Sequence, residues 1–373
     1  MRRRNRVVRL GASPLLVIAL AVMLVATMLA GALDFNVVHF RYLQTGQVIP
    51  GDLSAFRRNA LWAVGRGTAA GAGLPYPPPF LLLSVPMSWA SPLAETALWS
   101  LAGAILLVAA ARLAGIGWGA AGLGLLSPPA LYCFTMGQSG LFVSAFLLAA
   151  FGLAEAAPLI AGVAAGCVII KPQFGLLLPV CYLASRNWKA MGAAAATVLV
   201  LCGLSVGLFG LQMWRHFWVH DTGNAGHLLN QTWPVAYQLL MVTVFMMMRS
   251  LGGSFAVAYA AQGLACIAAM AASWLLWRRG AGATLERLAA MMCLAVLASP
   301  YAYTYDLAGV AIAIAGCAAA GGWRLPAPAA LFWLVSAVYV VISSLWFLTG
   351  AILLLAMLLS HWPRGRRDAA GMT

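Results

Sequence analysis

Long apolar runs recur along almost the whole chain and limit what it can fold into. A helix needs about 20 apolar residues to cross the roughly 30 Å hydrocarbon core of a bilayer. Only 8% of the 373 residues are charged and 63% are hydrophobic, whereas soluble domains carry roughly 25% charged residues. The sequence therefore excludes a soluble enzyme and predicts an all-α polytopic membrane protein, with residues 1–373 forming a single integral membrane domain.

The apolar runs predict about twelve transmembrane helices. The first run follows a basic N-terminus and is too long for a typical signal peptide, so we interpret it as a membrane span. Residues 235–249 are apolar but end in Arg249, which fits either an interfacial helix or a further span. The predicted spans are 12–33, 78–91, 93–112, 116–135, 141–157, 158–185, 190–211, 254–277, 288–301, 305–321, 327–345 and 346–361.

The formal net charge of +14 comes from basic residues that lie mostly beside apolar runs, where they set topology rather than bind nucleic acid. If residues 235–249 do not cross, the basic residues at 2–9, 186–189, 278–287, 324 and 364–367 can all lie in the cytoplasm together with both termini. The protein is then a multi-pass protein of the inner (plasma) membrane. Two long polar segments, 34–77 and 212–253, lie outside, and helices at 35–46 and 53–64 of the first are expected along the membrane surface.

Asp34 ends the first predicted span and opens the first outer segment, in a chain with only eight acidic residues. It is either a helix-end carboxylate among the lipid headgroups or a general base at the mouth of an external site. The second interpretation is supported by the effect of desolvation, which raises the pKa of a carboxylate and makes it a stronger base. His39 and Arg41 follow in the same stretch and are candidates for substrate binding.

Polar residues also interrupt the predicted spans. Gln138 lies in a glycine-flanked break at 136–140, which is either a simple turn or a binding site for a polar ligand. Lys171 and Gln173 flank Pro172, and the proline is expected to kink or split the helix at 158–185. A lysine this deep costs roughly 3 kcal/mol on insertion scales. Lys171 therefore either snorkels to an interface or has a partner, and a phosphate group would satisfy it.

A late proline break, Ser-Pro-Tyr-Ala-Tyr-Thr-Tyr-Asp at 299–306, joins two spans on the predicted outer side. Interfacial anchoring accounts for tyrosines such as Tyr301 but not for Asp306. His216, His220 and Asp221 are spaced as metal ligands sometimes are, but they match no metal motif, and no metal is predicted.

The seven cysteines lie singly in apolar runs, where packing is the simplest role and neither a disulfide nor a zinc site is expected. No Walker, Rossmann or Gly-x-Ser-x-Gly motif occurs, which argues against nucleotide-driven chemistry.

Six short motifs stand in the order found in one group of membrane enzymes. They are Asp-Phe at 34–35, Tyr-Pro-Pro-Pro-Phe at 76–80, Gly-Gln at 137–138, Ala-Gly followed by Lys-Pro-Gln within 161–173, Asn-Gln-Thr at 230–232 and Ser-Pro-Tyr at 299–301. Over about residues 30–310 the chain resembles the membrane glycosyltransferases of family 87, which include polyprenol-phosphate-mannose-dependent mannosyltransferases. The resemblance implies a GT-C type fold and transfer of a mannose-like hexose from a polyprenyl-phosphate sugar. The acceptor implied is a lipid or glycan on the outer face of the cytoplasmic membrane.

By that resemblance Asp34 is the general base that deprotonates the acceptor hydroxyl. The donor carries its own leaving group, so neither a nucleotide nor another cofactor is expected, and membrane lipids surround the site. Many relatives carry Ser-Pro-x-Ser-Trp-x-His after the late proline, whereas here Tyr303 and Tyr305 replace the tryptophan and the histidine. The residues expected to bind substrate are His39, Arg41, Tyr76, Gln138, Lys171, Gln173, Asn230, Gln231, Tyr301, Tyr305 and Asp306.

Two other functions also need polar groups among helices. A lipid-linked sugar flippase or transporter should show inverted repeats and opposed half-helices, but the sequence has no internal repeat and its polar residues gather on one predicted face. A purely structural membrane subunit does not explain Asp34, Lys171 and Asp306 in one chain.

Overall fold

A computed structural model describes residues 51–67, 76–222, 226, 229–235, 238–278 and 285–320. These residues are helical and form no β-strand, apart from one isolated bridge between Met241 and Tyr303. The all-α expectation is therefore confirmed for this part of the chain. The predicted first span, the helix at 35–46 and the two predicted spans after residue 321 lie outside it, as do Asp34, His39 and Arg41.

Among the described residues, three helices are long and apolar enough to cross a membrane: α4 (Pro92–Leu113), α10 (Trp188–Phe209) and α14 (Phe255–Arg278). They confirm three predicted apolar helices, and a 22-residue helix is about 33 Å long. Their outer faces carry exposed large apolar side chains, for example Leu101 (60% exposed), Leu199 (73%) and Leu264 (69%). Such surfaces are typical of a membrane protein, because lipid tails can cover them.

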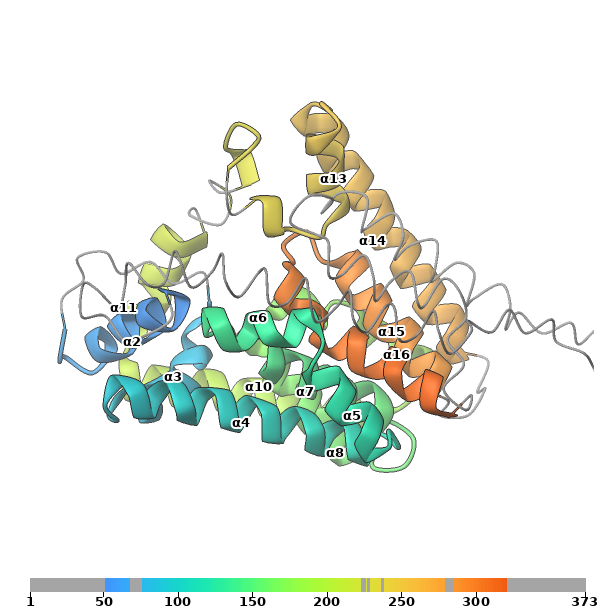
Figure 1. The fold of residues 1–373 in the computed structure, drawn as a ribbon, viewed down its shortest axis with the longest axis horizontal. Helices are drawn as coiled ribbons and strands as arrows, with labels where there is room; N and C mark the ends of the chain where they lie inside the picture. Colours follow the sequence, from blue (N-terminus) through green and yellow to red (C-terminus); the bar gives the residue numbers. More distant parts are fainter. Residues whose placement is uncertain are drawn as a thin grey trace, which may run out of the picture.

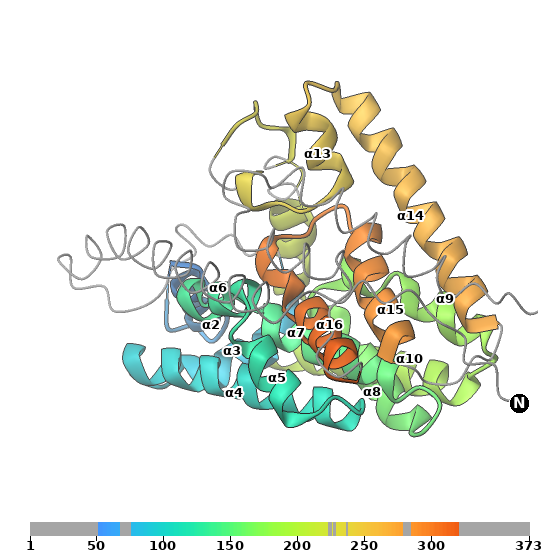
Figure 2. The same ribbon diagram turned by 45° about the vertical axis from the view of Figure 1, so that its right-hand side comes forward.

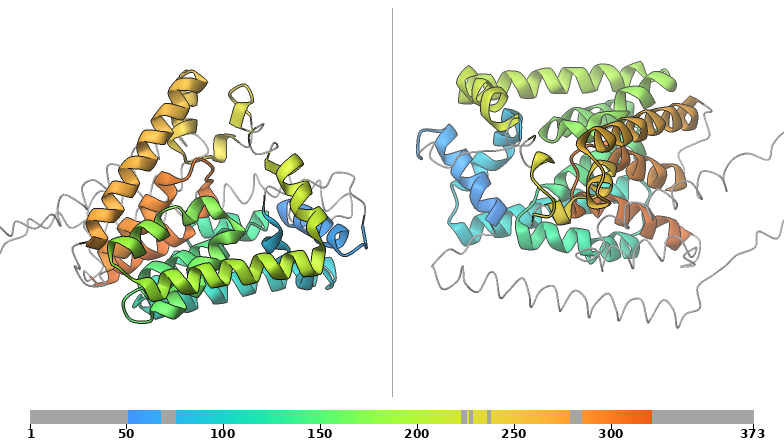
Figure 3. Two further views of the ribbon diagram at one scale, coloured as in Figure 1. Left: turned by 180° about the vertical axis from the view of Figure 1, so that it is seen from behind. Right: turned by 90° about the horizontal axis from the view of Figure 1, so that it is seen from above.

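Shorter apolar helices fill the space between the long ones (Figure 1). α7 (Gly140–Gly152) is largely buried and packs between α4 and α8 (Pro158–Cys167), and α10 covers α8. On the other side of α7 lie α15 (Leu285–Ala298) and α16 (Ala308–Ala320), which pack on each other. Seen from behind, α10 lies along one edge and α14 rises away from it (Figure 3).

Small residues allow α8 and α10 to approach closely. A side chain at Gly162 would clash with the carbonyl oxygen of Ala190, and one at Gly166 would clash with Thr197. Glycines four residues apart on one helix face are typical of close helix contacts in membranes.

The predicted span 116–135 is not one helix. The structure has α5 (Trp118–Leu125) and α6 (Pro128–Met136), separated at Ser127. Pro128 and Pro129 cannot donate backbone hydrogen bonds to the preceding turn, so a new helix begins there.

The predicted span 158–185 is split, as the proline suggested, but it also returns to the end from which it started. α9 (Leu177–Ala184) runs back towards the start of α8, packed against α14 and α10, and the Tyr182 hydroxyl donates to the carbonyls of Ala150 (3.0 Å) and Ala161 (3.2 Å). The Asn187 side chain donates to the Ala154 carbonyl at 2.6 Å. This segment is a helical hairpin rather than a crossing.

Residues 78–91 do not cross either. They form a short turn, η1 (Pro78–Phe80), and α3 (Leu81–Ser88). α2 (Gly51–Ala63) contacts the residues that follow α3. Arg57 of α2 donates to the Ala90 carbonyl and pairs with Glu95 of α4. Figure 2 shows α2, α3 and the start of α4 gathered at one end of the molecule.

These two corrections change which residues share an end of the molecule. One end, here called the basic end, carries Arg112, Glu155, Arg186, Arg278 and Arg287, near the turns after α4, α7, α9 and α14. Gln138 lies at the opposite end, beside α2. The predicted crossings at 78–91 and 158–185 are both removed. Removal of two crossings leaves the segments before residue 78 and after residue 185 on the same sides of the membrane, relative to each other, as predicted.

Residues 235–249 contain only η5 (Gln238–Leu240) and α13 (Val244–Ser250) among the described positions. Seven residues of helix are about 10 Å long, too short to cross a bilayer. Before them, α11 (Leu211–His216) and a π-helical turn, η4 (Phe217–Asp221), extend the chain beyond α10 towards α2. The His216 ring packs against Trp62 of α2 with centroids 4.8 Å apart.

Candidate functional site

Two interrupted helices meet near the end of the molecule opposite the basic end. The tip of the α8–α9 hairpin consists of two 3₁₀ turns, η2 (Val168–Ile170) and η3 (Pro172–Gly175), with Lys171 between them. The turn after α15 contains a third 3₁₀ turn, η6 (Thr304–Leu307). Lys171 Nζ donates to Asp306 Oδ1 at 2.6 Å and joins the two tips across 135 positions of sequence.

The Lys171–Asp306 ion pair is almost sealed from its surroundings. The lysine side chain is 5% exposed and the aspartate side chain 1%. The ammonium group also lies over the rings of Tyr305 (4.9 Å), Tyr76 (5.5 Å) and Phe174 (5.8 Å). The second carboxylate oxygen of Asp306 accepts from the Tyr303 backbone at 3.0 Å. Burying both charges costs several kcal/mol per ion before pairing, so these contacts are what makes the arrangement possible.

The break between α6 and α7 brings a third polar group to this place. Gly137 adopts a left-handed conformation (φ 68°), which ends α6 and turns the chain into Gln138. Gly140 lies so close to the Tyr305 carbonyl that any side chain there would clash with it. The Cys133 thiol donates to the same carbonyl at 3.2 Å. Two glycines therefore let this break reach the tip that carries Asp306.

Gln138 is buried and connects α2 to the residues before α3. Its amide nitrogen donates to Asp52 Oδ2 at 2.7 Å, and its amide oxygen accepts from the Tyr76 hydroxyl at 3.3 Å. Its backbone carbonyl accepts from the Trp99 indole at 3.2 Å. Ser139 donates to the Tyr76 hydroxyl at 3.2 Å. The amide orientation of Gln138 follows from these partners, because only its nitrogen can donate to a carboxylate.

Tyr76 links the glutamine to the ion pair. Its ring stacks on Phe80 (4.4 Å between centroids) and turns one face towards Lys171. Burial, and then the nearby Asp306 carboxylate, raises the pKa of the Tyr76 hydroxyl well above its usual value. The hydroxyl is therefore a hydrogen-bond donor across the physiological pH range.

Seven of the residues predicted to bind substrate meet in this cluster. Gln173 reaches the tip that follows α15, since its side chain donates to the Tyr301 carbonyl at 3.3 Å. The rings of Tyr301, Tyr303 and Tyr305 follow one another in contact, 5.1 Å and 5.2 Å apart. Gln173 and Tyr301 remain partly exposed at the rim. The seven residues are Tyr76, Gln138, Lys171, Gln173, Tyr301, Tyr305 and Asp306.

Asn230 and Gln231, also predicted to bind substrate, have other contacts. Asn230 accepts from the Tyr259 hydroxyl of α14 at 3.1 Å, and the Gln231 carbonyl accepts from Gln238 at 3.2 Å. Their segment is nevertheless tied to the cluster, because the Val242 backbone donates to the Ala302 carbonyl at 3.0 Å.

Asp52 and Ser139 belong to the cluster but are absent from the sequence-based prediction. Asp52 is one of the eight acids and lies at the start of a predicted surface helix, which is the one signal that favours it. Ser139 has no such signal. Both were missed because their role depends on where α2 and the α6–α7 break meet.

The histidines of the second outer segment form a separate group. His216 Nε2 lies 3.8 Å from Asp221 Oδ1, and the His216 and His220 rings are in tilted contact with centroids 4.8 Å apart. Within the described ranges, no three His, Cys, Asp or Glu side chains are placed to hold one metal ion.

A sealed charged pair lies where short apolar helices are interrupted, and the described residues also include three helices of membrane length. Together these features define a membrane protein with a polar site near one of its ends. The sequence profile of glycosyltransferase family 87 matches residues 74–300, more than half of the chain, and the chain belongs to that family. It is therefore a glycosyltransferase. Neither the curated proteins nor the solved structures contain a match to this chain.

Proposed function

We propose that this glycosyltransferase moves a mannose-like hexose from a polyprenyl-phosphate sugar to a lipid or glycan acceptor on the outer face of the inner membrane. The observation that supports this most is the buried cluster around Lys171 at the end opposite the basic end. If the basic end is cytoplasmic, as the distribution of arginines favours, the cluster lies towards the outer face. A donor held in the bilayer would reach it from the side, without a nucleotide.

Lys171 is the proposed partner of the donor phosphate. In the structure its charge is balanced by Asp306 at 2.6 Å. A phosphate that binds here therefore takes the place of the Asp306 carboxylate, which keeps its hydrogen bond to the Tyr303 backbone. Tyr76 and Tyr305, whose rings flank the ammonium group, and the rim residues Gln173 and Tyr301 are proposed to contact the sugar.

Asp34 is the proposed general base, on the strength of the family resemblance. It removes the proton of the acceptor hydroxyl while the hydroxyl oxygen bonds to the anomeric carbon. The bond from that carbon to the phosphate oxygen breaks, and the polyprenyl phosphate leaves with the electron pair. Asp52, which holds Gln138 in the described cluster, is proposed to position the site.

Substitution of the two acids tests these roles. In membranes supplied with a labelled polyprenyl-phosphate mannose, Asp34→Asn is expected to lower transfer by about 10²-fold or more, as loss of a general base does. Asp52→Asn is expected to lower it less, because the amide can still bond to Gln138 after its own rotation. Expression and thermal stability of both variants serve as controls.

Full transfer by Asp34→Asn would refute its assignment, and complete loss only in Asp52→Asn would make Asp52 the base. A nucleotide sugar used in place of the lipid-linked sugar would refute the proposed donor class.

A further inference from the structure

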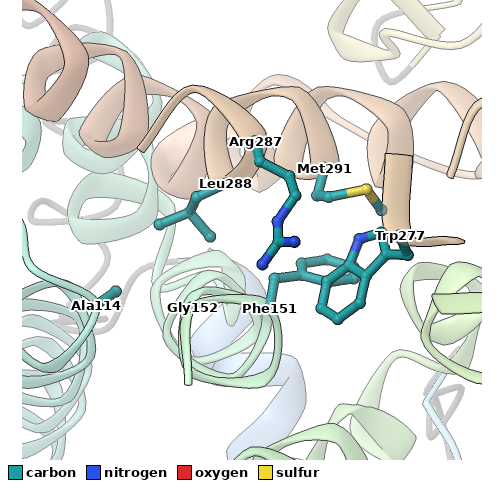
Figure 4. Close-up of a pocket in the computed structure, with 7 residues that line it drawn as sticks. All are labelled: Ala114, Phe151, Gly152, Trp277, Arg287, Leu288 and Met291. Carbon is teal, nitrogen blue, oxygen red and sulfur yellow. The ribbon is translucent and has the colours of Figure 1, made fainter. Parts of the chain in front are cut away.

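A small pocket lies at the basic end, away from the cluster around Lys171. It opens between α7, α14 and α15, and Figure 4 shows the Arg287 side chain extending into it from α15. Its other walls are mostly apolar. The residues that line it are Ala114, Phe151, Gly152, Trp277, Arg287, Leu288 and Met291.

The polar groups of the pocket are hydrogen-bond donors. Arg287 is 8% exposed, donates to Glu155 Oε1 at 2.6 Å and lies 4.7 Å over the Trp277 ring. Trp277 is 3% exposed, and its buried indole N–H has no acceptor among the residues that the structure describes. A buried donor without a partner is destabilising, so a ligand oxygen placed here gains a hydrogen bond that the described residues do not supply.

Size and charge restrict that ligand. The space open to the centres of water-sized groups is about 20 Å³, and roughly 10–15 Å³ of such space holds one water molecule. The pocket thus admits one or two oxygen atoms but not a sugar ring. Arg112, Arg186 and Arg278 lie at the same end and make it favourable for an anion.

The surface beside the pocket is apolar. On α14, Trp274 and Leu275 are 36% and 41% exposed, and Leu113 next to Ala114 is 64% exposed. Cationic pockets between membrane helices at the cytoplasmic side are suited to acidic headgroups, with the acyl chains along the neighbouring helices. Glu155 does not block such a ligand, because its side chain is 45% exposed and can turn into water.

We propose that the Arg287–Trp277 pocket binds a phosphate oxygen of an anionic phospholipid headgroup. The Trp277 indole donates to that oxygen, and the Arg287 guanidinium balances its charge. The lipid then joins α7, α14 and α15 at the end opposite the cluster around Lys171, so this site is distinct from the proposed donor site.

The test uses the full chain in a neutral detergent and counts bound lipids by native mass spectrometry. Phosphatidylglycerol is compared with phosphatidylcholine of the same acyl chains, and inorganic phosphate is added in a separate arm. Trp277→Phe removes the indole donor but keeps an aromatic ring under Arg287. Trp274→Phe makes the same change one turn earlier on α14, outside the pocket lining.

We expect wild type and Trp274→Phe to retain phosphatidylglycerol in preference to phosphatidylcholine, and Trp277→Phe to bind it about tenfold more weakly. Equal retention by wild type and Trp277→Phe would overturn the proposal. So would displacement of the lipid by inorganic phosphate at equal concentration, because the site would then bind free phosphate. Any general loss of folding appears as a lower melting temperature in lipid-free samples and is separated in that way.

Discussion

The two ends of the molecule each hold a buried cation over aromatic rings, yet the two ion pairs differ in their carboxylates. Lys171 pairs with Asp306, which is 1% exposed, whereas Arg287 pairs with Glu155, which is 45% exposed. Asp306 has no route into water without movement of the tip that carries it, while Glu155 has. The carboxylate at the Lys171 end can therefore leave its cation only when a tip moves, whereas the carboxylate at the Arg287 end can turn into water.

From this comparison we expect substitution of Lys171 to cause the largest loss of stability. Lys171→Met leaves the Asp306 carboxylate sealed without its counter-ion, and breaking such a pair costs about 3–5 kcal/mol. We expect a large fall in melting temperature in detergent together with loss of sugar transfer. The double variant Lys171→Met/Asp306→Leu removes both charges and should regain most of the stability but none of the transfer.

Substitution of Asp306 alone distinguishes a structural role of the Lys171–Asp306 pair from a role in donor binding. Asp306→Asn keeps the size of the side chain and removes the carboxylate that a donor phosphate must replace. We expect the apparent donor affinity to rise or stay unchanged. A loss of donor affinity as large as in Lys171→Met would show that the pair only holds the two tips together.

A smaller effect is expected at Tyr76, which joins the sealed pair to Gln138. Tyr76→Phe removes hydrogen bonds to Gln138 and Ser139, worth about 0.5–1.5 kcal/mol each. Because burial raises the pKa of this hydroxyl, its contribution to stability is fully present below its unfolded value near 10 and is lost as the pH rises through the folded value.

Thermal unfolding at pH 7 and at pH 10.5 measures this contribution. The difference in unfolding free energy between wild type and Tyr76→Phe should be constant up to about pH 10 and become smaller above it. A gap that closes near neutral pH would contradict the raised pKa.

The smallest effect is expected at the Arg287–Glu155 pair, whose carboxylate is partly exposed. Arg287→Gln leaves Glu155 half exposed to water, so the loss in unfolding free energy should be about 1 kcal/mol, as for surface pairs. Urea unfolding of the two variants side by side measures the contrast. A loss at Arg287 as large as that at Lys171 would remove the distinction between the two ends.

Several features of the fold follow from the sequence alone. The helical class and the three long apolar helices are set by the length of the apolar runs, because a bilayer core needs about 20 such residues. The split at Pro172 is equally local, since proline lacks a backbone donor. The sequence also selected Lys171 and Asp306, as charges too costly to lie in apolar segments without a purpose.

The tertiary structure decided which of these residues meet. Hydropathy measures only the length of an apolar run, so it treated the α8–α9 hairpin as a crossing and left the side of Gln138 undecided. Close packing at Gly140 and the return of α9 towards the start of α8 put Gln138, Lys171 and Asp306 at one end and brought Asp52 to them. Such contacts depend on helix packing between distant segments, which no single stretch of sequence encodes.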